Sequence, residues 1–186
     1  LGMAGGPQRI VCLTEETTEW LYLLGEERRI AGISGYTVRP RRARDEKPKV
    51  SAFTSAKLDK ILALCTSAGA DAAPLQADIA AALIRAGLPV MVFNQRSVAQ
   101  IADMLAQLAA LVGAAERGQA LLLQFEERLA LIQKAVQAQF ALGKRRPRIY
   151  FEEWDEPPIS GIRWVSELVG IAGGGDGFPE LAAQPL

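Results

Sequence analysis

Apolar residues recur at helical spacing along one long segment that contains no proline. Between Ala114 and Leu142, the residues that follow one another at steps of three or four are Leu122, Phe125, Leu129, Ile132, Val136 and Phe140. Charged and amide side chains fill the other positions, which is typical of a helix on a protein surface and not of a membrane span. We therefore expect one continuous helix over residues 114–142, roughly 43 Å long at a rise of 1.5 Å per residue.

The chain before this helix alternates between short apolar runs and amphipathic segments. Strands are predicted at Arg9–Leu13, Arg29–Ser34, Lys49–Phe53 and Pro89–Asn94, of which the last (PVMVFN) has the clearest pattern. One helix is predicted over Leu75–Ala86, and others begin after three residues that can act as N-caps, namely Thr14, Ser55 and Ser97. This alternation predicts parallel sheets with crossover helices.

After the long helix, a strand is predicted at Arg148–Trp154 and a helix at Arg163–Ile171. A single long helix between two α/β segments fits two arrangements. It can connect two lobes, or it can pack as an extra helix on one α/β domain. The spacing of the apolar residues leaves both open.

The composition excludes several classes of protein. With 49% hydrophobic and 23% charged residues, the chain is expected to form a folded core. Its formal net charge is zero, so no general attraction to nucleic acid or to an anionic membrane is expected. No uncharged apolar run reaches the roughly 20 residues of a membrane span, and the start, LGMAGGPQ, lacks the pattern of a signal peptide.

The chain contains no histidine, which removes the commonest general base and the commonest transition-metal ligand. The two cysteines, Cys12 and Cys65, match no metal or redox spacing, and Cys12 is expected to be a small core residue. We therefore predict no hydrolase chemistry, no metal site and no cofactor.

Ligands of open parallel sheets bind beyond the carboxyl ends of the strands. The residues at the predicted strand ends are Thr14, Ser34 to Tyr36, Phe53, Asn94 to Arg96, and Glu152 to Asp155. They are aromatic and polar, without a nucleophile–base pair, and such a set suits binding better than catalysis.

Five blocks of sequence, taken in order, resemble one known family. They are RIVCLTEETTEWLYLLG, IAGISGYTVRP, KVSAFTSAKLDKILAL, LPVMVFN and RIYFEEWDEPPISG. The chain resembles the substrate-binding proteins of ABC importers for vitamin B12 and iron chelates, above all their cobalamin-binding branch. The resemblance implies an α/β fold of two Rossmann-like lobes with parallel sheets, joined by one long helix. The implied boundaries are residues 8–112 for the N-terminal lobe, 113–143 for the connecting helix and 144–186 for the C-terminal lobe.

The resemblance also implies roles for individual residues. Aromatic rings that face the ligand are implied at Tyr36, Phe53 and Trp154, and further ligand contacts at Asn94, Glu153 and Arg163. A flat macrocycle suits such rings because they supply a large rigid contact area. In KLDKI, Asp59 matches the carboxylate with which the first lobe docks onto arginines of the membrane permease. From the residues alone, the rings could equally be packed at the edges of the lobes, and Asp59 could be an ordinary solvated residue.

The chain departs from the family pattern in two places. Where the family has an apolar strand, Cys65–Pro74 offers mainly small and polar residues, with Ala72 in place of a frequent aromatic, so we expect a loop there. The family also continues beyond FPELAAQP through most of its second lobe. The chain is accordingly expected to be a fragment whose second lobe is incomplete, and to bind ligand weakly as given.

These observations predict a binding protein with no chemistry of its own. By resemblance, it captures a corrinoid (cobalamin) or an iron chelate between two lobes, in the periplasm or elsewhere outside the cytoplasm, and delivers it to an ABC transporter permease. The alternative is a small α/β enzyme that uses the carboxylates of Glu153 and Asp155 on an anionic substrate. The basic segment Arg39–Lys49 is predicted to be a solvated face, with attraction of an anionic ligand as the second interpretation.

Overall fold

The computed structural model describes residues 6–52, 55–56, 77–156 and 158–182. The chain divides into two compact units. The first unit comprises residues 1–94 and 105–118, and the second comprises residues 95–104 and 119–186. The domain boundaries given above stay a prediction.

Among the described residues, the first unit is built on a sheet of four strands in the order β1-β2-β3-β4. Its strands are β1 (Ile10–Cys12), β2 (Ile30–Ser34), β3 (Lys49–Ala52) and β4 (Ser55–Ala56). The first three run parallel, as the alternation of strands and helices predicts, and β4 is antiparallel to β3. All three residues of β1 are buried and four of the five in β2 are, which explains their near-continuous apolar sequences.

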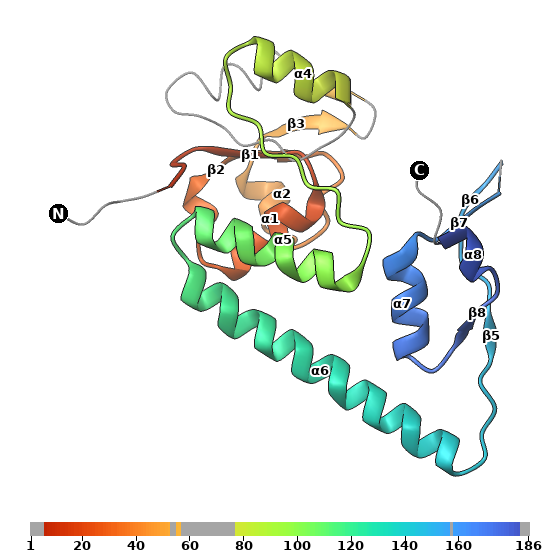
Figure 1. The fold of residues 1–186 in the computed structure, drawn as a ribbon. Coiled ribbons are helices and arrows are strands. Elements are labelled where there is room, and N and C mark those ends of the chain that lie inside the picture. The colour runs from red at the N-terminus through yellow and green to blue at the C-terminus, as the bar shows by residue number, and fades with distance from the viewer. Residues whose placement is uncertain (1–5, 53–54, 57–76, 157, 183–186) are drawn as a thin grey trace. The chain divides into compact units, whose positions relative to one another are not determined.

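Helices complete the first unit (Figure 1). In the described part of the chain they are α1 (Glu15–Leu23), the 3₁₀ helix η1 (Glu27–Arg29), α2 (Ala43–Glu46), α4 (Ala77–Arg85) and the second half of α5 (Val98–Leu111). The indole Nε1 of Trp20 in α1 donates a hydrogen bond to the carbonyl oxygen of Leu105 in α5 at 2.9 Å. Val11, Leu13, Leu21 and Ile33 are almost completely buried and form the centre of the core.

The N-caps predicted from the sequence have three different outcomes. Ser97 is confirmed, because its Oγ accepts the backbone N–H of Gln100 at 3.1 Å. Thr14 precedes α1 but makes no side-chain cap; instead its carbonyl oxygen accepts the hydroxyls of Thr17 and Thr18. Ser55 pairs with Ala52 in the antiparallel contact between β4 and β3, and the helix predicted after it lies outside the described residues.

The predicted strand at Pro89–Asn94 is wrong, because this segment has no strand assignment. Its side chains nevertheless alternate. Met91 and Phe93 line a small cavity together with residues of β1, whereas Val92 is 54% exposed. The segment therefore lies against β1 without a ladder of hydrogen bonds. The alternating apolar pattern predicts which side chains are buried. It does not predict whether the backbone pairs with a neighbouring strand.

The helix α6 (Ala115–Ala141) confirms the predicted continuous helix to within one residue at each end. It begins in the first unit and continues in the second. Along the predicted apolar face, Leu122 is buried and the other residues are partly buried, except Ile132, which is 45% exposed. Gly118 lies inside the helix without interrupting it.

The second unit contains two small two-stranded sheets. In one, β5 (Arg148–Ile149) runs parallel to β8 (Gly175–Asp176); in the other, β6 (Glu152–Asp155) forms an antiparallel hairpin with β7 (Pro158–Ser160). The single strand predicted at Arg148–Trp154 is thus two strands that belong to different sheets. The helix α7 (Arg163–Ile171) has the predicted bounds, and α8 (Pro179–Ala182) follows β8. Among the described residues, no helix is long and apolar enough to cross a membrane.

Candidate functional site

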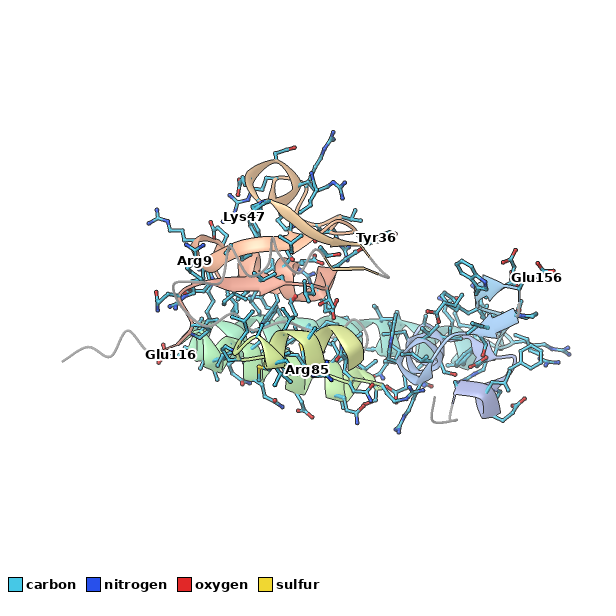
Figure 2. The ribbon with its side chains drawn as sticks, turned by 90° about the horizontal axis from the view of Figure 1, so that it is seen from above. Arg9, Tyr36, Lys47, Arg85, Glu116 and Glu156 are labelled. Atoms are coloured by element: carbon cyan, nitrogen blue, oxygen red, sulfur yellow. The ribbon has the colours of Figure 1, made fainter. Side chains whose placement is uncertain are left out.

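The carboxyl ends of β1, β2 and β3 lie at one edge of the sheet because the three strands are parallel. The loop after β2 carries the most prominent candidate at this edge, Tyr36. Tyr36 is 52% exposed. Figure 2 labels this residue at the margin of the first unit. Close to Tyr36 in the chain, Ser34 and Thr37 are almost inaccessible to solvent, and Gly35 is partly buried.

The backbone of this loop is tightly bonded. The Tyr36 N–H donates to Oγ of Ser34 at 3.2 Å, and the Thr37 N–H donates to the carbonyl oxygen of Ser34 at 3.1 Å. A loop that buries the residues on both sides of an exposed ring presents that ring as a feature of the fold and not as a frayed end. Tyr36 therefore remains a candidate for ligand contact.

The basic segment Arg39–Lys49 is partly neutralised within the first unit. Arg39 pairs with Glu19 at 3.3 Å, and Arg42 pairs with Glu27 at 3.4 Å. The guanidinium of Arg42 also lies 4.8 Å from the ring centroid of Tyr22. These contacts favour a structured, solvated face, as the sequence predicts.

Tyr22 connects α1 with α2. Its hydroxyl donates a hydrogen bond of 2.7 Å to Oε2 of Glu46. Burial raises the pKa of Tyr22 well above its usual range, and the hydrogen bond to Glu46 and the charge of that carboxylate raise it further. Tyr22 is a structural residue that the sequence analysis did not identify. No sequence signal joins it to Glu46, which lies 24 positions away.

Three predictions for the first unit are not tested by its described part. Phe53, Asp59 and the segment Cys65–Pro74 lie outside the described residues. Asn94 is described and is exposed at the end of the segment that follows α4. Cys12 is buried in β1 as predicted, and burial raises the pKa of its thiol to about 12.

The hairpin of β6 and β7 carries the candidates of the second unit. Trp154 is 60% exposed, its indole Nε1 donates to the carbonyl oxygen of Glu156 at 3.0 Å, and Ile159 is its partner on β7. Glu156 is labelled in Figure 2 at the turn of this hairpin. The ring is thus held by its neighbours while much of its surface stays available for a ligand.

The carboxylates of Glu153 and Asp155 lie on the same strand as Trp154 and are exposed. Trp154 and Asp155 pair with Ile159 and Pro158, so their side chains lie on opposite faces, whereas the register of the ladder shifts at Glu153. Neither carboxylate lies in a site that excludes water, which acid–base catalysis by carboxylates usually needs. The geometry therefore gives no support to the enzyme alternative.

Arg163 begins α7 and donates a hydrogen bond of 2.8 Å from Nε to Oε1 of Glu167. The other oxygen of Glu167 accepts the backbone N–H of Val98, the first residue of α5, at 2.7 Å. A carboxylate at a helix N-terminus is favoured by the helix dipole. Glu167 was missed in the sequence, although its spacing of four from Arg163 is that of an ion pair on a helix.

The structure also contains an open groove of about 720 Å³ between α6 and α7 in the second unit. Its walls include Lys134, Val136, Arg146, Glu167 and Ile171. None of the predicted ligand residues that the structure describes lines it. Among the described residues there is no group of three or more histidine, cysteine or carboxylate side chains that could hold a metal ion.

Tyr36 and Asn94 belong to the first unit, and Glu153, Trp154 and Arg163 belong to the second. Within the second unit, Glu153 and Trp154 are adjacent on β6, whereas Arg163 lies at the start of α7. That residues of both units serve one ligand stays a prediction.

Comparison with known proteins agrees with this architecture. The chain is 27% identical over 190 residues to the vitamin B12-binding protein of Vibrio campbellii; the match covers 97% of this chain and 65% of that protein. The chain therefore spans just under two thirds of the length of this curated relative. Among solved structures, it is similar to the periplasmic vitamin B12 binding protein of Vibrio cholerae, with a TM-score of 0.74 and 22% identity over 96% of this chain and 68% of that one.

A periplasmic heme-binding protein from Roseiflexus is similar as well, with a TM-score of 0.78 and 19% identity over 97% of this chain and 71% of that one. At these identities the two solved structures establish the fold, which is the predicted α/β fold with parallel strands and a long helix. The family model of periplasmic binding proteins matches residues 10–184. This match agrees with the predicted binding protein and not with the enzyme alternative. The chain belongs to the periplasmic binding protein family.

Proposed function

We propose that this chain forms the ligand-capturing part of an ABC importer's substrate-binding protein, and that its ligand is a corrinoid such as cobalamin or an iron chelate such as haem. The observation that carries the proposal is the family match over residues 10–184. Relatives named for vitamin B12 and for heme support the choice of ligand class. Such proteins act outside the cytoplasm, and the proposed partner is the permease of the importer.

The proposed ligand contacts are Tyr36, Phe53, Asn94, Glu153, Trp154 and Arg163, drawn from both units. Support comes from the exposure of Tyr36 and Trp154, whose rings are presented by hydrogen-bonded neighbours in a loop and a hairpin. An exposed, oriented aromatic ring can stack on a flat macrocycle with little loss of side-chain entropy. The proposed docking residue for the permease is Asp59, whose carboxylate would pair with arginine.

The test is a titration of the full-length protein with cyanocobalamin and, separately, with haemin. Trp154→Ala and Tyr36→Ala are each expected to weaken binding by about 1–3 kcal/mol, or about fivefold to 150-fold, as for a stacked aromatic anchor. Tyr150→Ala is the matched control, because Tyr150 is 53% exposed and lies outside the proposed set.

The proposal on these residues is wrong if both substitutions leave the affinity unchanged while the circular dichroism spectrum stays that of the wild type. An equal loss for Tyr150→Ala would likewise remove the specific roles of Tyr36 and Trp154. The ratio of the cyanocobalamin and haemin affinities decides between a corrinoid and an iron chelate.

A further inference from the structure

The loop that presents Tyr36 is held from outside by one arginine. The Nη1 nitrogen of Arg44 donates to the carbonyl oxygen of Gly35 at 3.1 Å and to that of Thr37 at 2.7 Å. These two carbonyls lie on either side of Tyr36. A single guanidinium nitrogen thus fixes two peptide groups near the exposed ring, Gly35–Tyr36 directly before it and Thr37–Val38 beyond it, with charge-assisted hydrogen bonds, which are stronger than neutral ones.

Arg44 itself lies on a fixed support. It belongs to α2, whose first residue, Ala43, is completely buried. At the other end of α2, the carboxylate of Glu46 accepts the hydroxyl of Tyr22 at 2.7 Å. The ammonium of Lys49 in turn donates to the carbonyl oxygen of Arg44 at 3.0 Å. The guanidinium therefore reaches the loop from a segment that is anchored on both sides.

Ser34 and Arg44 bond different groups of this loop, because Ser34 binds N–H groups whereas Arg44 binds carbonyl groups. Ser34 binds the N–H groups of Tyr36 and Thr37, through its Oγ and its carbonyl oxygen. Ser34 thus binds the N–H groups of Tyr36 and Thr37, and Arg44 binds the C=O groups of Gly35 and Thr37. Without Arg44 these two carbonyls lose a cationic partner, and the Gly35–Tyr36 peptide plane, which helps to set the direction of the Tyr36 side chain, gains freedom to rotate.

We propose that Arg44 is a positioning residue for ligand capture, which acts by holding Tyr36 in its outward orientation before the ligand arrives. The proposal rests on the proposed function, because it assigns to Arg44 a part of the affinity that Tyr36 supplies. A loop that is already rigid before binding raises the affinity, because little conformational entropy of the loop is then lost when the ligand binds.

The experiment compares Arg44→Ala with Arg41→Ala in the full-length protein. Arg41 is exposed on the same basic segment, so both substitutions remove one positive charge and only the first removes the bonds to the loop. Arg44→Ala is expected to weaken binding of cyanocobalamin or haemin about tenfold (about 1.4 kcal/mol), and Arg41→Ala less than about twofold (about 0.4 kcal/mol). Arg44→Lys keeps the charge without the planar guanidinium and is expected to fall between them.

A double variant shows whether Arg44 acts through Tyr36. In the Tyr36→Ala background, the further change Arg44→Ala is expected to cost little, because the ring that it positions is gone. Equal losses in the two backgrounds would overturn the proposal. So would a wild-type affinity in Arg44→Ala when Tyr36→Ala alone weakens binding.

Hydrogen exchange of the ligand-free protein separates this proposal from the proposed function. The amides of Tyr36 and Thr37 are expected to exchange about tenfold faster in Arg44→Ala than in Arg41→Ala. Equal exchange in the two variants would overturn the positioning role, whatever the ligand is. If the wild type binds neither cyanocobalamin nor haemin, the proposed function fails, and the exchange rates still decide whether Arg44 holds the loop.

Discussion

Gly118→Ala is expected to destabilise the protein even though this exchange normally stabilises a helix. Gly118 is a buried residue within α6, where replacement by alanine ordinarily gains about 1 kcal/mol of helix propensity. A Cβ at this position would lie 2.4 Å from Cβ of Ala109 in α5, far inside van der Waals contact. It would also approach the side chains of Trp20 and Leu24 at 3.7 and 3.8 Å.

The clash joins two atoms that sit directly on the backbone, so neither can rotate away and the helices must move apart. Overpacking of this kind costs about 1–3 kcal/mol, and a rigid contact belongs in the upper part of that range. After subtraction of the helix propensity, the free energy of unfolding is expected to fall by about 1–2 kcal/mol. Urea denaturation followed by circular dichroism measures this difference.

Gly170→Ala is the matched control. Gly170 lies in α7, and a Cβ there would meet nothing within 4 Å, so this variant is expected to gain about 0.5–1 kcal/mol. The change Ala109→Gly in the Gly118→Ala protein is expected to recover part of the loss. The reasoning is refuted if Gly118→Ala is as stable as the wild type, or if its loss is no smaller when Ala109 is also glycine.

Three further predictions concern single residues. The thiol of Cys12 should escape iodoacetamide at pH 8 in the native protein and react in denaturant, because burial raises its pKa to about 12; rapid native labelling of its peptide would contradict this. Since the folded state keeps Tyr22 protonated above the pKa of the unfolded chain, wild-type stability should fall more steeply than that of Tyr22→Phe as the pH rises above about 10, and parallel denaturation midpoints would show otherwise. Asp59→Ala should lower uptake through the permease with ligand affinity unchanged, and normal uptake would exclude the docking role.

Local apolar patterns predicted the bounds of those helices and strands that depend mainly on the residues within the segment itself. The helix over Arg163–Ile171 has the predicted bounds, and the strand predicted at Arg29–Ser34 begins one residue later, at Ile30. In β2 the two isoleucines are buried by the fold, and in α7 Val165 is buried. The break between β5 and β6 inside the predicted strand Arg148–Trp154 was missed, because pairing depends on where β8 and β7 lie and not on the residues between.

The candidate site shows the same division. Tyr36 and Trp154 are visible in the sequence as aromatic residues at predicted strand ends, the family resemblance implies their role, and both are exposed. Arg44 was not, because its role depends on the distances from its guanidinium to the carbonyls of Gly35 and Thr37, which lie nine and seven positions earlier in the chain. No periodic pattern marks a contact that a turn of the chain creates.

The most direct test of the central claim is calorimetric titration of the full-length wild-type protein with cyanocobalamin and with haemin, followed by recovery of the ligand. The account predicts that one of the two binds in a ratio of one ligand per chain, with a dissociation constant of about 1 μM or tighter, equivalent to about −8 kcal/mol. It also predicts that the ligand is recovered with its absorption spectrum and mass unchanged. Absence of binding by both ligands, or recovery of a chemically altered ligand, would contradict the assignment as a binding protein for corrinoids or iron chelates.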